Sequence, residues 1–408
     1  EEYKFYDRNV MLYPAKDLIF FQADIHGNQL VRERVKTLRR LMERKPVTIV
    51  TTYAALMTPQ VMWDRERDVI DVSRGGTLQE SELAKRLVAM GYEKTYQVES
   101  HGQFSIRGGI VDIFDLTEEN PYRIELWGDE VESIRSFDIL SQRSIEKLES
   151  ISVYPATEFV LEDARIREGM KRLEEDAAAR EKMFRDEYKT EEAHRISTQV
   201  KELKEQLLEF KSKVNLESYI RYFYEEMLTL PEMLAELAGG IAPGGAGGTK
   251  VTGMNTPVFF LEEPARIKEQ ASAIELEFRE SMEQRAEKGY ILPGQMDILY
   301  SGEQVAAKLL KCSVVTISTM DIRGGYFKAD LKVDVSARNV APYNNSFEAL
   351  VKDLKQYRRN GFRVLLLSGS RTRAKRLAED LRDQELSAVY TEDAFREVLP
   401  GEVLTYYG

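Results

Sequence analysis

The sequence contains little cysteine, histidine and tryptophan, with one Cys, three His and two Trp among 408 residues. The single cysteine, Cys312, excludes a disulfide framework, and the scattered histidines have no zinc-ligand spacing. No stretch approaches the roughly 18 uninterrupted apolar residues of a membrane span, and the N-terminus has no secretory pattern. We therefore expect a protein of the reducing cytoplasm that does not contact a membrane.

The chain also lacks an excess of positive charge, because 69 acidic residues face 58 basic ones and the net charge is −11. This balance disfavours non-specific binding of nucleic acid by the bulk surface. Hydrophobic residues make up 43%, which suffices for ordinary packed cores, and at roughly 150 residues per domain the length predicts two to three domains. The chain starts at Glu1 and ends without a polar tail, so we expect a fragment of a longer protein.

The first 64 residues have an α/β pattern. Apolar residues at three- and four-residue steps predict an amphipathic helix: Val31, Val35, Leu38 and Met42. The apolar run Val47–Val50 that follows predicts a buried strand.

Residues 65–155 change to short alternating runs separated by turn residues, which predicts a β-sheet of hairpins. A short helix is expected before them, at about Ser81–Met90. This stretch has the size of a compact α+β domain inserted into the α/β fold.

After residue 155 the sequence predicts a helical segment followed by further α/β segments. Charged amphipathic repeats predict a helical hairpin within Glu162–Lys213, and the glycine-rich run Gly239–Gly253 predicts a flexible loop or linker. A long helix is expected at about Ala265–Lys288. From residue 338 a small α/β domain begins, in which Phe362–Leu367 is so apolar that it predicts a central strand.

Nucleotide hydrolysis is the first chemistry to consider. The apolar strand Val258–Leu261 delivers Glu262 and Glu263 at its carboxyl end, where an NTPase would present a magnesium-binding acid. The phosphate-binding string G-x-x-x-x-G-K-[ST] is nowhere present, and Gly248-Thr249-Lys250 is only a partial match. We therefore expect no catalytic, metal-binding or cofactor-binding residues in this segment.

The strand "YRIELWG" carries the most informative pattern. Because side chains alternate between the faces of a strand, Arg123 and Trp127 share one face, and the neighbouring segment "FSIRGGIVDIF" adds Arg107 at a Gly-Gly bend. Arginine and tryptophan are enriched at the energetic centres of protein interfaces. The alternative is that Trp127 packs under a loop and both arginines form surface ion pairs worth less than about 1 kcal/mol each.

These strings resemble motifs shared by the UvrB and transcription-repair coupling factor (Mfd) families. "FSIRGGIVDIFD" and "YRIELWGDEVESIRSFD" carry the resemblance, and "RKPVTIVTTYAALMTP", "SISVYPATEF" and "FFLEEPARI" follow in the same order along the chain. The N-terminal segment has Tyr6 and Tyr13 but no tyrosine cluster of the kind that forms the DNA-handling hairpin of UvrB. The chain is therefore more similar to the N-terminal part of a transcription-repair coupling factor.

The resemblance implies a degenerate P-loop NTPase-like (UvrB-like) domain at 1–64 and 156–337, with an inserted α+β UvrA-binding domain at 65–155. A small α/β domain would occupy 338–408. Glu262 and Glu263 would be the vestige of the nucleotide-site strand, whereas ATP and magnesium would bind in motor domains outside this chain.

The function that the resemblance implies is recruitment of UvrA, in transcription-coupled nucleotide excision repair, to a stalled RNA polymerase. Arg107, Arg123 and Trp127 would contact UvrA directly, and the full-length protein would be an ATP-dependent DNA translocase that reaches polymerase and DNA through other domains. The alternatives are a UvrB-type excinuclease subunit or another ATP-dependent DNA-handling enzyme, and a purely structural spacer.

Overall fold

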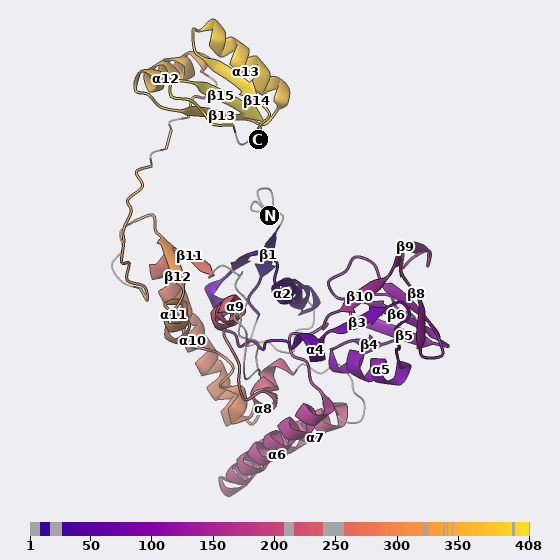
Figure 1. Ribbon diagram of the computed structural model, residues 1–408. Coiled ribbons are helices and arrows are strands. Elements are labelled where there is room, and N and C mark those ends of the chain that lie inside the picture. Colours follow the sequence, from indigo (N-terminus) through magenta and orange to yellow (C-terminus); the bar gives the residue numbers. More distant parts are fainter. Residues whose placement is uncertain are drawn as a thin grey trace. The chain divides into compact units, whose positions relative to one another are not determined.

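The computed structural model describes residues 9–16, 27–207, 216–239, 257–320, 325–337, 339–340, 342–344, 346–393 and 396–407. The chain has a mixed α/β fold with several sheets and divides into two compact units, Glu1–Asp330 and Leu331–Gly408 (Figure 1). No helix in the described part is long and apolar enough to cross a bilayer.

Two parallel strand pairs form the α/β part of the first unit. Their strands are β1 (Val10–Tyr13) with β2 (Thr48–Thr51), and β11 (Val258–Glu262) with β12 (Ser313–Ile317). Parallel neighbours need a crossover, which helices supply in both pairs. These helices are α2 (Gly27–Met42) between β1 and β2, and α10 (Pro264–Glu287) and α11 (Gly302–Leu309) between β11 and β12.

The predicted amphipathic helix is confirmed as α2, whose Val35 and Leu38 are buried in the main core. The predicted buried strand at Val47–Val50 is wrong in its burial. It corresponds to β2, but Val50 is 37% exposed. Among the described residues β2 pairs only with β1, and an apolar run does not show which of its side chains another element will cover.

A six-stranded sheet lies within residues 65–155, the expected inserted domain, and has the order β4-β5-β6-β7-β8-β9. Its strands are β4 (Glu93–Lys94), β5 (Gln103–Arg107), β6 (Ile110–Phe114), β7 (Tyr122–Trp127), β8 (Glu130–Phe137) and β9 (Ser144–Leu148). The pairs from β5 to β9 are antiparallel, as expected for hairpins. Leu83 and Leu87 of α5 (Glu80–Ala89) join the core cluster that includes Phe104 and Ile124 on one face of the sheet.

A short antiparallel ribbon joins the inserted domain to the rest of the unit. It pairs β3 (Ile70–Ser73) with β10 (Ser150–Val153), so the chain enters and leaves the domain side by side. Two short helices, α3 (Tyr53–Leu56) and α4 (Arg65–Asp68), precede β3.

Buried charges hold this junction. The Arg34 side chain of α2 is 1% exposed, and its Nε donates to both carboxylate oxygens of Glu158 at 2.9 and 3.0 Å. Lys16 Nζ lies 2.5 Å from Glu158 Oε1, and the indole N–H of Trp63 donates to the Glu158 carbonyl at 3.0 Å. A buried carboxylate requires such partners, so the exit of the inserted domain is fixed against α2.

The helical part of the first unit has its own core. Its elements are α6 (Asp163–Asp186), α7 (Thr190–Glu205), the 3-10 helix Glu217–Tyr219, α8 (Ile220–Phe223), α9 (Leu230–Gly239) and the 3-10 helix Pro293–Gln295. Helices α6 and α7 form the predicted hairpin (Figure 1) and share the cluster that contains Leu173 and Ile196. The predicted glycine-rich loop lies outside the described residues, apart from Gly239 at the end of α9.

The second unit is a small parallel α/β sheet in the order β13-β15-β14. Its elements are α12 (Phe347–Arg359), β13 (Val364–Ser368), α13 (Arg371–Asp383), β14 (Ala388–Thr391) and β15 (Val403–Tyr407). The predicted central strand Phe362–Leu367 is wrong, because β13 lies at the sheet edge, and Leu365 and Leu367 are 51% and 66% exposed. The central place is taken by β15, a strand that comes later in the chain.

Candidate protein-docking site

Two arginines meet on one buried carboxylate in the face of the sheet that α5 does not cover. Asp112 of β6 lies directly opposite Arg123 of β7 in the strand register. Arg123 donates from Nε to Asp112 Oδ1 at 2.6 Å and from Nη2 to Oδ2 at 2.8 Å. Arg107, at the end of β5, donates from Nη2 to the same Oδ2 at 3.0 Å. The structure thus brings together the two arginines that the sequence selected.

The three side chains differ in exposure. Those of Asp112, Arg123 and Arg107 are 2%, 14% and 36% exposed, respectively. A carboxylate that is so buried is stable only when charged partners replace its hydration. The hydrogen bonds to Asp112 raise the pKa of Arg123 above its ordinary value. Asp112 is therefore a positioning residue for both guanidinium groups.

Sequence reasoning missed Asp112, although a signal was present. In "IRGGIVDIF" the aspartate interrupts a run of apolar residues on a predicted strand. A charged residue at such a place needs a partner on a neighbouring strand, and Arg123 is in the next one. Only the strand register shows that the two face each other.

Arg123 makes further contacts besides those with Asp112. Its Nη2 also donates to Gln142 Oε1 at 2.9 Å, and its guanidinium lies 4.3 Å from the centroid of the Phe137 ring. Gln142 has a φ of 58°, so the backbone of this loop adopts a left-handed conformation that glutamine seldom takes. Arg107 is held more loosely, and its guanidinium lies 5.5 Å from the ring centroid of Tyr96. Of the two arginines, Arg107 is thus the better placed to reach a partner.

Trp127 lies at the end of β7 with 81% of its surface exposed. Strand alternation puts it on the same face as Arg123, and its register partner is Glu130 across a turn at Gly128. The alternative that Trp127 packs under a loop is wrong, since nothing in the described part covers it. A solvated indole leaves a large apolar surface for a partner to bury.

The local excess of positive charge is smaller than the sequence suggested. Besides Asp112, the next acidic residue on this face, Glu125, lies 2.5 Å from Arg135 and accepts a hydrogen bond from Ser133 at 2.6 Å. The bond from Ser133 and the charge of Arg135 lower the pKa of Glu125 below its usual range. These ion pairs neutralise part of the positive potential of this face. A partner would therefore be bound more by direct contacts with Arg107 than by long-range electrostatic attraction.

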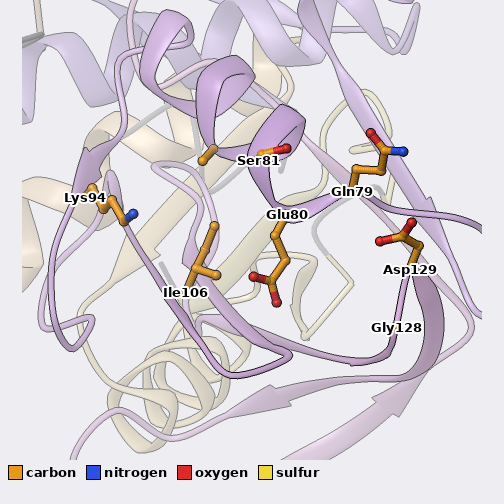
Figure 2. A pocket seen from close by; sticks show the side chains of 8 residues that line it. Gln79, Glu80, Ser81, Lys94, Ile106, Gly128 and Asp129 are labelled. Carbon is orange, nitrogen blue, oxygen red and sulfur yellow. The ribbon is translucent and has the colours of Figure 1, made fainter.

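A cavity of about 500 Å³ opens beside the turn Gly128–Asp129 that follows Trp127. Its lining residues are Gln79, Glu80, Ser81, Ala84, Lys94, Ile106, Gly128 and Asp129. Figure 2 shows the Glu80 carboxylate between Lys94 and Asp129. Glu80 Oε1 accepts a hydrogen bond from Gly109 N at 3.1 Å, and Gly109 O accepts one from Leu126 N at 2.7 Å. The cavity wall thus braces the end of β7 where Trp127 is attached.

The two predicted vestigial acids lie in another part of the unit. Glu262 ends β11 and is exposed, and Glu263 has a φ of 51° just before α10. Glu263 Oε1 accepts hydrogen bonds from Thr319 N and Oγ1 at 2.9 and 2.7 Å, and these bonds lower its pKa. Among the described residues no group of three His, Cys, Asp or Glu is arranged to hold a metal ion.

Comparison with known proteins finds relatives that match nearly the whole chain. A family described as "UvrB interaction domain" matches residues 70–159. The transcription-repair-coupling factor of Bacillus subtilis (strain 168) is 29% identical over 405 residues, which cover 98% of this chain and 32% of that protein. The factor of Staphylococcus haemolyticus (strain JCSC1435) is 25% identical over 407 residues, with coverages of 98% and 32%.

A UvrABC system protein B, from Kosmotoga olearia, is 32% identical over 211 residues, which cover 52% of this chain and 32% of that protein. The chain spans about a third of the length of the curated relatives that it matches. The domain carrying Arg107, Asp112, Arg123 and Trp127 is the stretch that the family match covers. The chain is thus similar to the transcription-repair-coupling factors along nearly its whole length, and its residues 70–159 match the family of the UvrB interaction domain.

Proposed function

We propose that the inserted domain docks UvrA, and that this chain is the N-terminal portion of a factor that recruits nucleotide excision repair to stalled RNA polymerase. The observation that carries the proposal is the exposed Trp127 on the same sheet face as the Arg107–Asp112–Arg123 cluster. The relatives' names, which refer to transcription-repair coupling and to the UvrABC system, support the choice of partner.

The chemistry of docking follows from what each side chain offers. Arg107 can donate to a carboxylate of UvrA, and charge-assisted hydrogen bonds of this kind are about twice as strong as neutral ones. Trp127 can enter an apolar recess and lose its contact with water. Arg123, held by Asp112 and Gln142, mainly keeps the surface rigid, which lowers the entropy lost on binding.

The rest of the chain would serve as scaffold. We propose that residues 1–64 and 156–337 form a degenerate NTPase-like domain around the inserted 65–155, with a small α/β domain at 338–408. The parallel pair of β11 and β12 supports this division, with Glu262 and Glu263 at the carboxyl end of β11. ATP, magnesium, polymerase and DNA would be bound by other parts of the full-length protein.

Titration of purified UvrA with the chain tests the docking role. Arg107→Glu and Trp127→Ala should each weaken binding about 30-fold, which corresponds to about 2 kcal/mol. Arg279→Glu is the matched control, because Arg279 is exposed on α10 and makes the same change of charge outside the inserted domain. Equal affinities for the wild type, Arg107→Glu and Trp127→Ala would overturn the proposal.

The UvrB-type alternative rests on the similarity to the Kosmotoga protein over half of the chain. It predicts ATP hydrolysis or tight DNA binding by the purified chain. An ATPase assay that gives no turnover above background favours docking, whereas measurable turnover favours the alternative.

A further inference from the structure

Three large apolar side chains stand in solvent around the arginine cluster, and only one of them was selected from the sequence. Tyr96 is 84% exposed, Trp127 is 81% exposed and Leu140 is 92% exposed. Scattered exposed hydrophobic residues are normal on a protein surface. These three differ from scattered surface residues, because hydrogen bonds tie the backbone that carries each of them to the strands or side chains of the arginine cluster.

Tyr96 is placed beside Arg107 by β5. Thr95 N donates to Phe104 O at 2.8 Å, and Ser105 Oγ donates to Tyr96 O at 2.7 Å. The backbone at Tyr96 is therefore fixed while its ring faces solvent, 5.5 Å from the Arg107 guanidinium. A ring at this distance favours the cation and restricts its position.

Leu140 is held out by a loop that also holds Arg123. The loop closes on itself, because Gln142 N donates to Asp138 O at 2.8 Å and Asp138 N donates to Arg143 O at 2.9 Å. Gln142 adopts the left-handed conformation. Its Nε2 donates to Ile139 O at 2.8 Å, and its Oε1 accepts from Arg123 Nη2 at 2.9 Å. Leu140 thus projects from a braced loop, since it lies between residues that are tied to the cluster.

Arg107, at the centre of this surface, can bind an acidic group of a partner. The hydrogen bond that Arg107 makes within the described residues uses Nη2 alone, and its side chain is 36% exposed. Its other N–H groups can therefore donate to an incoming carboxylate in the fork geometry that arginine provides. An acidic residue flanked by apolar recesses would satisfy both the guanidinium and its exposed neighbours.

We propose that Tyr96 and Leu140 are, together with Trp127, three apolar anchors of one docking surface centred on Arg107. This proposal rests on the proposed function, so its partner is UvrA, which would present a carboxylate between three apolar recesses. Interface energy concentrates in such desolvated side chains around a polar contact, and bracing reduces the entropy lost on docking.

Binding of UvrA to the single variants Tyr96→Ala and Leu140→Ala tests the two new anchors. Each should raise the dissociation constant about tenfold. Tyr188→Ala is the matched control, since Tyr188 is 92% exposed but lies between α6 and α7, outside the inserted domain, and the affinity should change less than twofold. Circular dichroism of each variant should match the wild type, because the removed atoms are in solvent.

The outcomes separate the two proposals. If Trp127→Ala weakens binding but Tyr96→Ala and Leu140→Ala behave like Tyr188→Ala, the docking function stands and the three-anchor surface is overturned. If Trp127→Ala and Arg107→Glu also leave the affinity unchanged, the docking function itself fails. Self-association that Leu140→Ala abolishes would assign Leu140 to contact with a second copy and would likewise overturn the proposal.

Discussion

Replacing Asp112 with asparagine should destabilise the inserted domain far more than the small change in size suggests. The Asp112 carboxylate is 2% exposed and accepts two hydrogen bonds from Arg123 and one from Arg107. The variant leaves a largely buried guanidinium without its counter-charge, and removing one member of a buried ion pair costs 3–5 kcal/mol as an order of magnitude. Because Arg107 can regain water, we expect the lower end, about 3 kcal/mol of lost unfolding free energy.

The measurement is urea unfolding followed by tryptophan fluorescence. A Trp127→Phe background leaves Trp63 as the only tryptophan, and Trp63 is 3% exposed at the junction of the inserted domain. The free energy of unfolding follows from the midpoint and the slope against urea concentration.

The matched control is Glu125→Gln on the same sheet face. Glu125 and Arg135 also form an ion pair, but their side chains are 31% and 26% exposed, so its loss should cost less than about 1 kcal/mol. If Asp112→Asn loses no more stability than Glu125→Gln, the reasoning that burial makes Asp112 the centre of the cluster is refuted. Asp112→Asn should also weaken UvrA binding about tenfold, since Arg107 loses its anchor.

Three further predictions concern the scaffold. Burial opposes ionisation of Glu158, but the charges and hydrogen bonds of Arg34 and Lys16 together outweigh it and lower the pKa of Glu158. The ionised carboxylate therefore stabilises the folded state above the unfolded pKa of about 4.3. This stabilisation is lost as the pH falls through the lower folded pKa. The difference in unfolding free energy between wild type and Glu158→Gln should therefore shrink below about pH 4, and a difference independent of pH would contradict this. Gly169→Ala should cost about 1–3 kcal/mol in urea unfolding, because the added Cβ would lie 2.1 Å from the Phe223 ring; unchanged stability would show that the ring moves aside. Tyr188→Gly should raise stability by about 1 kcal/mol, because Tyr188 has a φ of 61° after α6, and a lower urea midpoint would contradict it.

The elements with regular periodicity were predicted well from the sequence. Helix α2, the hairpin of α6 and α7, and the antiparallel sheet of the inserted domain all follow from spacings of 3.6 and two residues. Such patterns are local, since they state which side chains of one element share a face.

Strand placement within a sheet was predicted poorly. Phe362–Leu367 is as apolar as a central strand, but β13 is an edge strand and Leu365 is 51% exposed. Hydrophobicity shows how favourable the burial of a strand would be. The place of β13 in the sheet depends instead on which later segment pairs with it, and that segment is β15. Val50 in β2 shows the same limit.

At the candidate site, alternation along β7 sufficed to place Arg123 and Trp127 on one face. It did not reveal Asp112, Gln142, Tyr96 or Leu140, because their roles depend on contacts across strands and on one loop conformation. Arg123 and Asp112 are 11 positions apart in sequence, and Gln142 reaches Arg123 from 19 positions away.

The sequence by itself determined that this chain is a mixed α/β protein with an antiparallel sheet of hairpins and a strand that carries arginine and tryptophan on one face. These properties follow from composition and from the fixed periods of helices and strands. Only the tertiary structure decided that the arginines share a buried carboxylate, that Trp127 is solvated and that Tyr96 and Leu140 flank the same cluster. The physical reason is that burial and ion pairing are properties of neighbours in space, and strand register, not sequence distance, decides which residues become neighbours.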